Sequence, residues 1–346
     1  MKPAKAGVHR GGAVPSSAKE QSGGGEEAGG GDRGRLGPVA ARILMKVLWV
    51  ARFARLDLLR AVGFLATKIT KWTSTCDRQL YRLIGYMKGS ANLRMVGWVG
   101  DSFGSITPHL YADADFAGCV DTLRSTSGVH QALLGPHTNF PIAGHSKRQG
   151  CVSHSTPEAE MVAMDFAMRT TGLPAHSLWE ALMPKGHRLA VHEGNQAMMA
   201  CVRSGRNPTM RYLHRTHRVS VQWLHERFTA DDSLADLSYE DSIDMCADIY
   251  TKAFSEDQKW MHACDLINII NPGRLRERFR QHTAYMGKPP PGEGGKASPC
   301  PLGGGTRFTR LHRSWVRWAG VSRCHRSWVR WAGVSRCHRQ WDGDSR

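Results

Sequence analysis

The spacing of hydrophobic residues changes along the chain and predicts where helices and strands lie. Apolar residues recur at helical spacing over 43–70 and 77–87, which predicts a small helical unit. Between 106 and 255, short apolar runs alternate with helical patterns, and turn signals occur at Ser127-Gly128 and Gly135-Pro136. Strands that come first and then alternate with helices predict an α/β fold, in which helices cover a mixed sheet.

The same pattern gives approximate bounds for the elements of 106–255. Strands are predicted over 106–113, 127–134, 138–144, 189–191 and 234–239. Helices are predicted over 155–172, 174–183, 195–202, 219–228 and 243–254. The first helix opens at Ser155-Thr156-Pro157-Glu158, which fits a capping box with proline in the first turn.

The two ends differ from the middle in composition. Residues 1–40 are rich in Gly, Ser, Ala and charge, and we expect a disordered leader because they offer too little apolar surface to bury. Residues 256–346 are expected to form a basic, largely disordered tail. Within it, the sequence HRSWVRWAGVSRC of His312–Cys324 repeats unchanged over His325–Cys337. The interleaved Trp and Arg residues could stack on nucleic acid, or the repeat records a duplication or read-through at the gene level.

The net charge of +17 is distributed unevenly. Residues 271–346 carry 16 Lys and Arg against 4 Asp and Glu, whereas 106–254 carry 13 against 16. The high pI is therefore mainly a property of the tail. A basic tail suits an acidic partner such as nucleic acid, and a solvated tail without a partner is the alternative interpretation.

Cysteine usage and hydropathy bear on the compartment. The nine cysteines are scattered and form no C-x-x-C pair, which argues against a zinc or redox motif and fits a reducing, intracellular setting, either cytoplasm or nucleus. No apolar run approaches the roughly 18 residues that a membrane-spanning helix needs, so no membrane partner is expected. The first residues also lack the apolar core of a secretory signal.

Several acids follow strands or lie on helices at positions that suit metal binding. Asp113 and Asp115 share one face at the end of a predicted strand, and an acidic turn is the simplest interpretation of that pair alone. Glu160 lies on the helix that opens at the capping box, and Asp248 lies on the last predicted helix. Hard divalent cations prefer oxygen ligands, and two such ions can support phosphodiester cleavage.

Five segments in order resemble the ribonuclease H region of copia-type LTR-retrotransposon polyproteins. The family pattern Y-x-D-A-D-W-A-G-C-x-D-T-R-R-S-T-S-G is matched over 111–128, apart from Phe116 and Leu123. The other four family patterns, S-K-R-Q, S-S-T-E-A-E-Y-V-A, D-N-Q-A and A-D-x-x-T-K-A, correspond to 146–149, 154–163, 194–197 and 247–253. Upstream, Ala51–Asp57 and Tyr86–Ser90 look like the linker that follows the reverse transcriptase.

This resemblance implies a domain division and a function. It implies that 41–100 is a helical remnant of the reverse transcriptase linker and that 106–255 is an RNase H-like mixed sheet flanked by helices. The chain would be a C-terminal piece of a polyprotein. The implied activity is hydrolysis of the RNA strand of RNA/DNA hybrids with Mg²⁺ or Mn²⁺.

Matched position by position, the four metal-binding acids of the family fall on Asp113, Glu160, residue 194 and Asp248. Residue 194 is Gly194, so the two-metal site is expected to be incomplete and cleavage impaired or absent. The adjacent Glu193 is predicted to be a poor replacement, because neighbouring strand residues point to opposite faces. Asp115 and Glu158 are assigned to the turn and the helix cap. The alternatives to an enzyme are an inactive remnant that binds nucleic acid and a pseudogene product.

A basic strip interrupts the otherwise acidic domain. It consists of four arginines accompanied by His214 and His217, namely Arg206, Arg211, Arg215 and Arg218. Such a strip beside an acidic site fits a grip on the phosphate backbone of an RNA/DNA hybrid. A solvated basic loop is the alternative.

Overall fold

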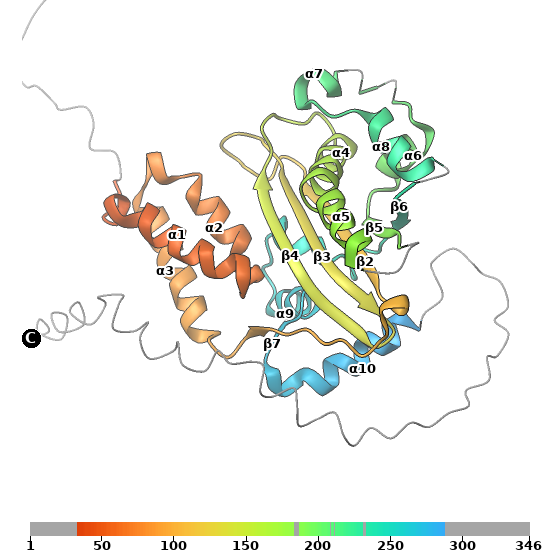
Figure 1. Ribbon diagram of the computed structural model, residues 1–346. Coiled ribbons are helices and arrows are strands. Elements are labelled where there is room, and N and C mark those ends of the chain that lie inside the picture. Colours follow the sequence, from red (N-terminus) through yellow and green to blue (C-terminus); the bar gives the residue numbers. More distant parts are fainter. Residues whose placement is uncertain (1–32, 183–186, 208, 211, 231–232, 288–346) are drawn as a thin grey trace, which may run out of the picture. The chain divides into compact units, whose positions relative to one another are not determined.

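The structure is a computed structural model that describes residues 33–182, 187–207, 209–210, 212–230 and 233–287 (Figure 1). The described residues all belong to the compact unit Met1–Pro291. Residues 1–32 of the expected leader, Arg211 of the basic strip and the repeat near the C-terminus lie outside them. No helix among the described residues is long and apolar enough to cross a membrane.

Three helices form the N-terminal part: α1 (Gly37–Phe53), α2 (Leu59–Ala66) and α3 (Ser74–Gly89). α1 begins with Pro38 in its first turn, so the helix starts inside the segment predicted to be a leader. The start of α1 is tied to α3 because Asp77 accepts hydrogen bonds from the backbone N–H groups of Arg35 and Leu36 at 2.6 and 3.1 Å. The composition of 1–40 does not reveal this anchor of Arg35 and Leu36.

The central sheet has the strand order β4-β3-β2-β5-β6. Its strands are β2 (Thr107–Asp115), β3 (Thr126–Gly135), β4 (Thr138–Arg148), β5 (Leu189–Glu193) and β6 (Ala235–Tyr239). Short connections make β2, β3 and β4 antiparallel, whereas helical crossovers make β5 and β6 parallel to β2 and β5. The predicted α/β fold, a mixed sheet flanked by helices, is therefore confirmed.

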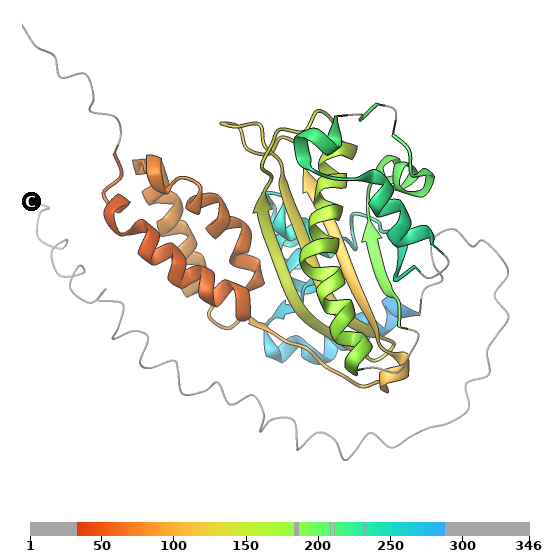
Figure 2. The same cartoon turned by 45° about the horizontal axis from the view of Figure 1, so that its top comes forward.

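Helix α4 (Thr156–Ala167) lies across one face of this sheet, as Figure 2 shows. Its start matches the predicted capping box, because Ser155 Oγ accepts a hydrogen bond from the Glu158 N–H at 3.3 Å. The buried Met161 and Met164 of α4 pack with Leu110 and Val191 of the sheet. A π-helical turn, Met168–Gly172, continues into α5 (Leu173–Leu182). The crossover after β5 contains α6 (Gln196–Ser204), α7 (Leu213–His217) and α8 (Val221–Thr229).

The chain after β6 differs from the sequence prediction in two places. The helix predicted over 243–254 is a single 3-10 turn, η5 (Cys246–Tyr250), in which all five residues are buried. The expected disorder of 256–346 is wrong for its first part, which forms α9 (Asp257–Leu266), β7 (Ile269–Ile270) and α10 (Leu275–Met286). The sequence of this segment is highly charged, and only a few apolar side chains pack these elements against the rest of the fold. Its hydrophobic pattern is therefore too weak to predict them.

One hydrophobic core joins the N-terminal helices to the second face of the sheet. It includes Leu44 and Leu80 of the helices, Tyr111 of β2, Tyr250 of η5 and Ile269 of β7. β7 pairs antiparallel with the short strand β1 (Arg94–Met95), which follows α3. The segment that resembles a polymerase linker therefore shares its core with the segment that resembles ribonuclease H.

Candidate active site

The structure brings Asp113, Glu160 and Asp248 together at one edge of the fold. Asp113 lies near the end of β2, Glu160 on α4 and Asp248 in η5, and they are 8%, 6% and 9% exposed. Glu160 accepts a hydrogen bond from the backbone of Ala114, beside Asp113. These residues lie up to 135 positions apart in the sequence, and their role as metal ligands stays a prediction.

Two residues that follow η5 contact these acids. The hydroxyl of Thr251 donates a hydrogen bond to Asp113 Oδ2. The ammonium of Lys252 lies 2.7 Å from Asp248 Oδ2 and 3.9 Å from Asp113 Oδ1. Thr251 therefore fixes the orientation of Asp113, and Lys252 partly neutralises both aspartates.

Mutual repulsion among the acids is visible in their pKa values. Burial, together with the negative charges of Glu193 and Asp113, raises the pKa of Glu160 to about 10. Burial and the charge of Asp113 raise the pKa of Asp248 to about 6. Carboxylates that are crowded in this way are ionised together only when a cation lies among them.

Glu193 also belongs to this site, which the sequence argument does not predict. Leu189, Val191 and Glu193 alternate on the face of β5 that packs against α4, so Glu193 lies on the same side of the sheet as Glu160. Glu193 is 1% exposed, and burial together with the charge of Asp113 raises its pKa. β5 ends at Glu193, so the expected alternation with Gly194 does not apply. The period-two pattern of 189, 191 and 193 is the sequence signal that identifies it.

Three buried carboxylate oxygens in the described part of the chain have no hydrogen-bond partner, one each on Glu160 (Oε2), Glu193 (Oε2) and Asp248 (Oδ1). Unpaired carboxylate oxygens of this kind are suitable ligands for a hard divalent cation, which would itself favour the ionised form of these acids. The described residues nevertheless contain no group of three or more His, Cys, Asp or Glu side chains that could hold a metal ion as they are arranged. Carboxylate oxygens are the kind of ligand that Mg²⁺ prefers. The metal-binding role of these acids stays a prediction.

Two glycines shape the site. A Cβ at Gly128 of β3 would lie 2.6 Å from Thr251 Cγ2 and 2.8 Å from Ala247 O, so a glycine there lets η5 approach the sheet beside Asp113. A Cβ at Gly194 would lie 3.6 Å from Met245 Cε and 3.7 Å from Glu240 O, which are ordinary contacts. Position 194 therefore accepts a Cβ without a steric clash.

Asp115 and Glu158 have the structural roles that the sequence predicts. Asp115 accepts a hydrogen bond from the backbone N–H of Thr126 and so bridges the two strands of the β2–β3 hairpin. Glu158 accepts one from the His154 N–H at 2.9 Å and therefore caps α4. Its other oxygen lies 3.0 Å from His217 Nε2, which connects the end of α7 to the start of α4.

The described part of the basic strip is exposed. Arg206, Arg215 and Arg218 make no ion pair within the described residues. Arg215 lies on α7, and the contact between His217 and Glu158 places this segment beside the first turn of α4, the helix that carries Glu160. Arg215 thus lies on a segment that contacts the start of the helix carrying Glu160.

Comparison with known proteins relates the chain to a mobile element. No family model matches it. Over 123 residues it is 32% identical to the retrovirus-related Pol polyprotein from transposon RE1 of Arabidopsis thaliana, a match that covers 36% of this chain and 8% of the relative. The chain therefore spans a small part of that polyprotein's length. The chain is related to a retrotransposon polyprotein.

Among solved structures, the NurA nuclease from Sulfolobus solfataricus is similar with 8% identity, and the match covers 59% of this chain and 54% of that one. Its TM-score is 0.22, which is too low to support an argument about fold or function.

Proposed function

We propose that this retrotransposon-related chain contains a copia-type ribonuclease H-like domain that hydrolyses the RNA strand of RNA/DNA hybrids with Mg²⁺ or Mn²⁺. The activity is weak because Gly194 stands where the family that the sequence resembles has a metal-binding aspartate. The observation that carries this proposal is the convergence of Asp113, Glu160 and Asp248 from three separate elements.

Asp113, Glu160 and Asp248 would hold the cation, together with the nearby Glu193. The cation would supply charge stabilisation for the phosphodiester and a lowered pKa for the attacking water. Thr251 holds Asp113 in place, and the exposed Arg206, Arg215 and Arg218, with Arg211, would bind the phosphate backbone.

A second candidate function is nucleic-acid binding without cleavage. The observation that favours it is the ammonium of Lys252, which is 2.7 Å from Asp248 and 3.9 Å from Asp113. It already provides positive charge to two of the three acids and so opposes cation binding. Gly194 removes a further ligand from the same site.

Cleavage can be measured directly with the full chain, since one core joins its N-terminal helices to the sheet. We expect slow cleavage of an RNA/DNA hybrid labelled on its RNA strand, dependent on Mg²⁺ or Mn²⁺, and no cleavage of duplex DNA. Asp248→Asn should abolish it by removing a buried charge that the cation needs. Cleavage that continues unchanged in Asp248→Asn, or in EDTA, would contradict the proposed site.

Cation binding can be tested apart from catalysis. A divalent ion that binds only the folded chain stabilises it and so raises its melting temperature. At a free-ion concentration a hundredfold above the dissociation constant, the free energy of unfolding increases by about 2.7 kcal/mol. We expect Mn²⁺ to raise the melting temperature of the unmodified chain and of Asp121→Asn, whose acid lies outside the site. Asp113→Asn should show little rise. Equal shifts in all three proteins would contradict metal binding at Asp113.

A further inference from the structure

A cavity of about 730 Å³ lies beside the acidic site. Its walls come from α2, α3, the loop between β2 and β3, and β4, with Trp260 of α9 at one side. This volume is typical of a small-molecule site. It is too small for a double helix, whose major groove alone is about 12 Å wide.

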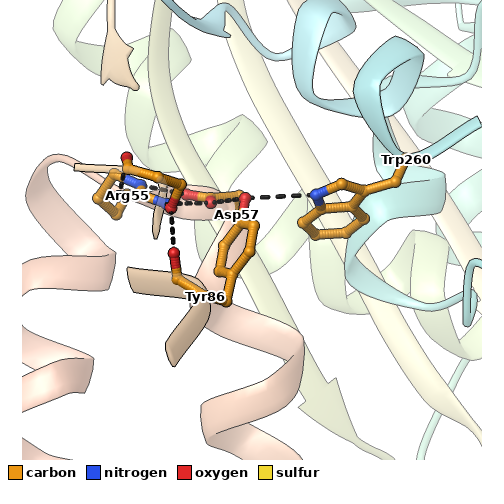
Figure 3. Close-up of polar contacts among 5 residues, drawn as sticks. Arg55, Asp57, Tyr86 and Trp260 are labelled. Atoms are coloured by element: carbon orange, nitrogen blue, oxygen red, sulfur yellow. Dashed lines mark hydrogen bonds and ion pairs between the residues drawn. The ribbon is translucent and has the colours of Figure 1, made fainter. Parts of the chain in front are cut away.

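The cavity has an excess of positive charge. Three arginines line it, Arg60, Arg82 and Arg148, whereas the ammonium of a fourth basic lining residue, Lys147, lies over the ring of Phe166 at 4.7 Å. The two acids in its wall are Asp57 and Asp115, and Asp57 is already paired with Arg55 at 2.8 Å (Figure 3). The charge of the cavity therefore suits an anionic ligand.

A hydrogen bond to the backbone fixes the position of the Arg60 guanidinium. Its Nε donates a hydrogen bond to the backbone oxygen of Thr251 at 2.7 Å, which is the one hydrogen bond of its side chain within the described residues. The half-buried guanidinium also interacts electrostatically with Asp115 in the same wall, and no hydrogen bond of its two terminal nitrogens occurs among the described residues. A planar guanidinium fixed in this way is well suited to bind a phosphate.

The cavity is connected to the acidic site through two contacts. Thr251, which anchors Arg60, also donates its hydroxyl hydrogen bond to Asp113. Asp115 lies in the cavity wall, two residues beyond Asp113 on β2. A ligand in the cavity would therefore lie next to the acids.

Aromatic groups complete the lining. Phe64 of α2 is 41% exposed, and Trp260 lies in the same wall. Aromatic faces combined with a cationic groove are the features with which proteins bind single-stranded nucleic acid, because each base can stack on a ring while its phosphate contacts Arg or Lys.

We propose that this cavity binds a nucleotide of a single-stranded stretch of nucleic acid, with its base against Phe64 and its phosphate on Arg60 and Arg82. The inference rests on the proposed function in one respect, that the bound strand continues toward Asp113.

The test uses a charge introduced into the cavity without loss of any native contact. Gly63 of α2 lines the cavity, and a Cβ there would meet only Ser146 O, at 3.6 Å. Gly63→Glu therefore adds a negative charge, and Gly63→Gln is its matched neutral control. Residues 271–346 carry 16 Lys and Arg, so overall binding would not report on the cavity alone. The readout is the yield of photo-crosslinking between Phe64 and iodouracil-containing DNA or RNA oligonucleotides in EDTA, determined by mass spectrometry.

We expect Gly63→Glu to lower this yield about tenfold at limiting oligonucleotide, because like charges oppose binding, and Gly63→Gln to leave it within about twofold. On α3, Arg82→Ala should lower the yield, whereas Arg78→Ala, an exposed arginine of the same helix outside the cavity, should not. Crosslinking of either DNA or RNA with this charge dependence supports the proposal, and the preferred oligonucleotide identifies the strand.

Equal yields for Gly63→Glu and Gly63→Gln, or no crosslink at Phe64, would overturn the inference. These outcomes are separable from those of the cleavage assay. Hybrid cleavage without a charge-dependent crosslink would support the proposed function and contradict nucleotide binding in the cavity. A charge-dependent crosslink without hybrid cleavage would support nucleotide binding in the cavity and contradict the proposed ribonuclease activity.

Discussion

Replacing Gly194 with Asp should raise the rate of RNA/DNA hybrid cleavage by at least about tenfold, since the loss of a group that supports a metal ligand typically costs about 10–100-fold. The substitution is sterically permitted, because a Cβ at this position meets Met245 and Glu240 at ordinary distances. It adds a carboxylate directly after Glu193, at the end of the strand that neighbours Asp113. The measurement is the initial cleavage rate of the full chain with Mg²⁺ and with Mn²⁺.

Two controls make the result specific to charge at this site. Gly194→Asn has nearly the same size without the charge and should give no gain. Adding Asp113→Asn to Gly194→Asp should remove the gain, because the new carboxylate would then have no partner on β2. If the unmodified chain already cleaves as fast as Gly194→Asp, the missing acid is not needed, and Glu193 would be the residue that replaces it.

Asp57→Ala should destabilise the chain by about 3–5 kcal/mol, because it leaves a buried guanidinium without its counter-charge. Arg55 donates to both carboxylate oxygens of Asp57 at 2.9 and 2.8 Å, and Tyr86 donates to Oδ2 at 2.8 Å (Figure 3). The network reaches α9 through Trp260, whose Nε1 donates to Tyr86 Oη at 3.3 Å. Asp57 is 3% exposed, so the ion pair is largely shielded from solvent. The measurement is the free energy of unfolding from a denaturant titration.

The matched control is an equally short ion pair at the surface. Arg188 lies 2.7 Å from Asp236, and the two side chains are 42% and 62% exposed. Asp236→Ala should cost less than about 1 kcal/mol, because solvent screens exposed pairs. Equal losses at Asp57 and Asp236 would show that burial of the Arg55–Asp57 pair contributes nothing.

The connection through Asp57 also bears on how the two motif regions relate. Asp57 and Tyr86 belong to the segments that resemble a polymerase linker, and Trp260 follows the segment that resembles ribonuclease H. Because these side chains share hydrogen bonds and a core, changes in the linker should affect the stability of the acidic site. A truncated sheet domain without α1–α3 would expose that core to water.

Local sequence patterns account for much of the fold. Apolar runs bounded by turn signals predict β2 and β3, and Ser155 with Glu158 predicts the start of α4, because these signals depend only on neighbours in the chain. The resemblance to copia-type ribonuclease H motifs, matched position by position, implies Asp113, Glu160 and Asp248 as site residues. The long apparent helix around Asp248 was wrong, because a segment buried on all sides has no amphipathic period to read.

What the sequence by itself determined is therefore local: the strands, the helix cap and the chemical types of the site residues. Only the tertiary structure decided that Glu193 shares a face with Glu160 and that Lys252 lies between Asp113 and Asp248. The cavity likewise depends on α2 packing beside β4. The physical reason is that the position of a residue along a strand or helix sets the face on which its side chain lies. The distance between residues more than a hundred positions apart depends instead on how the core packs.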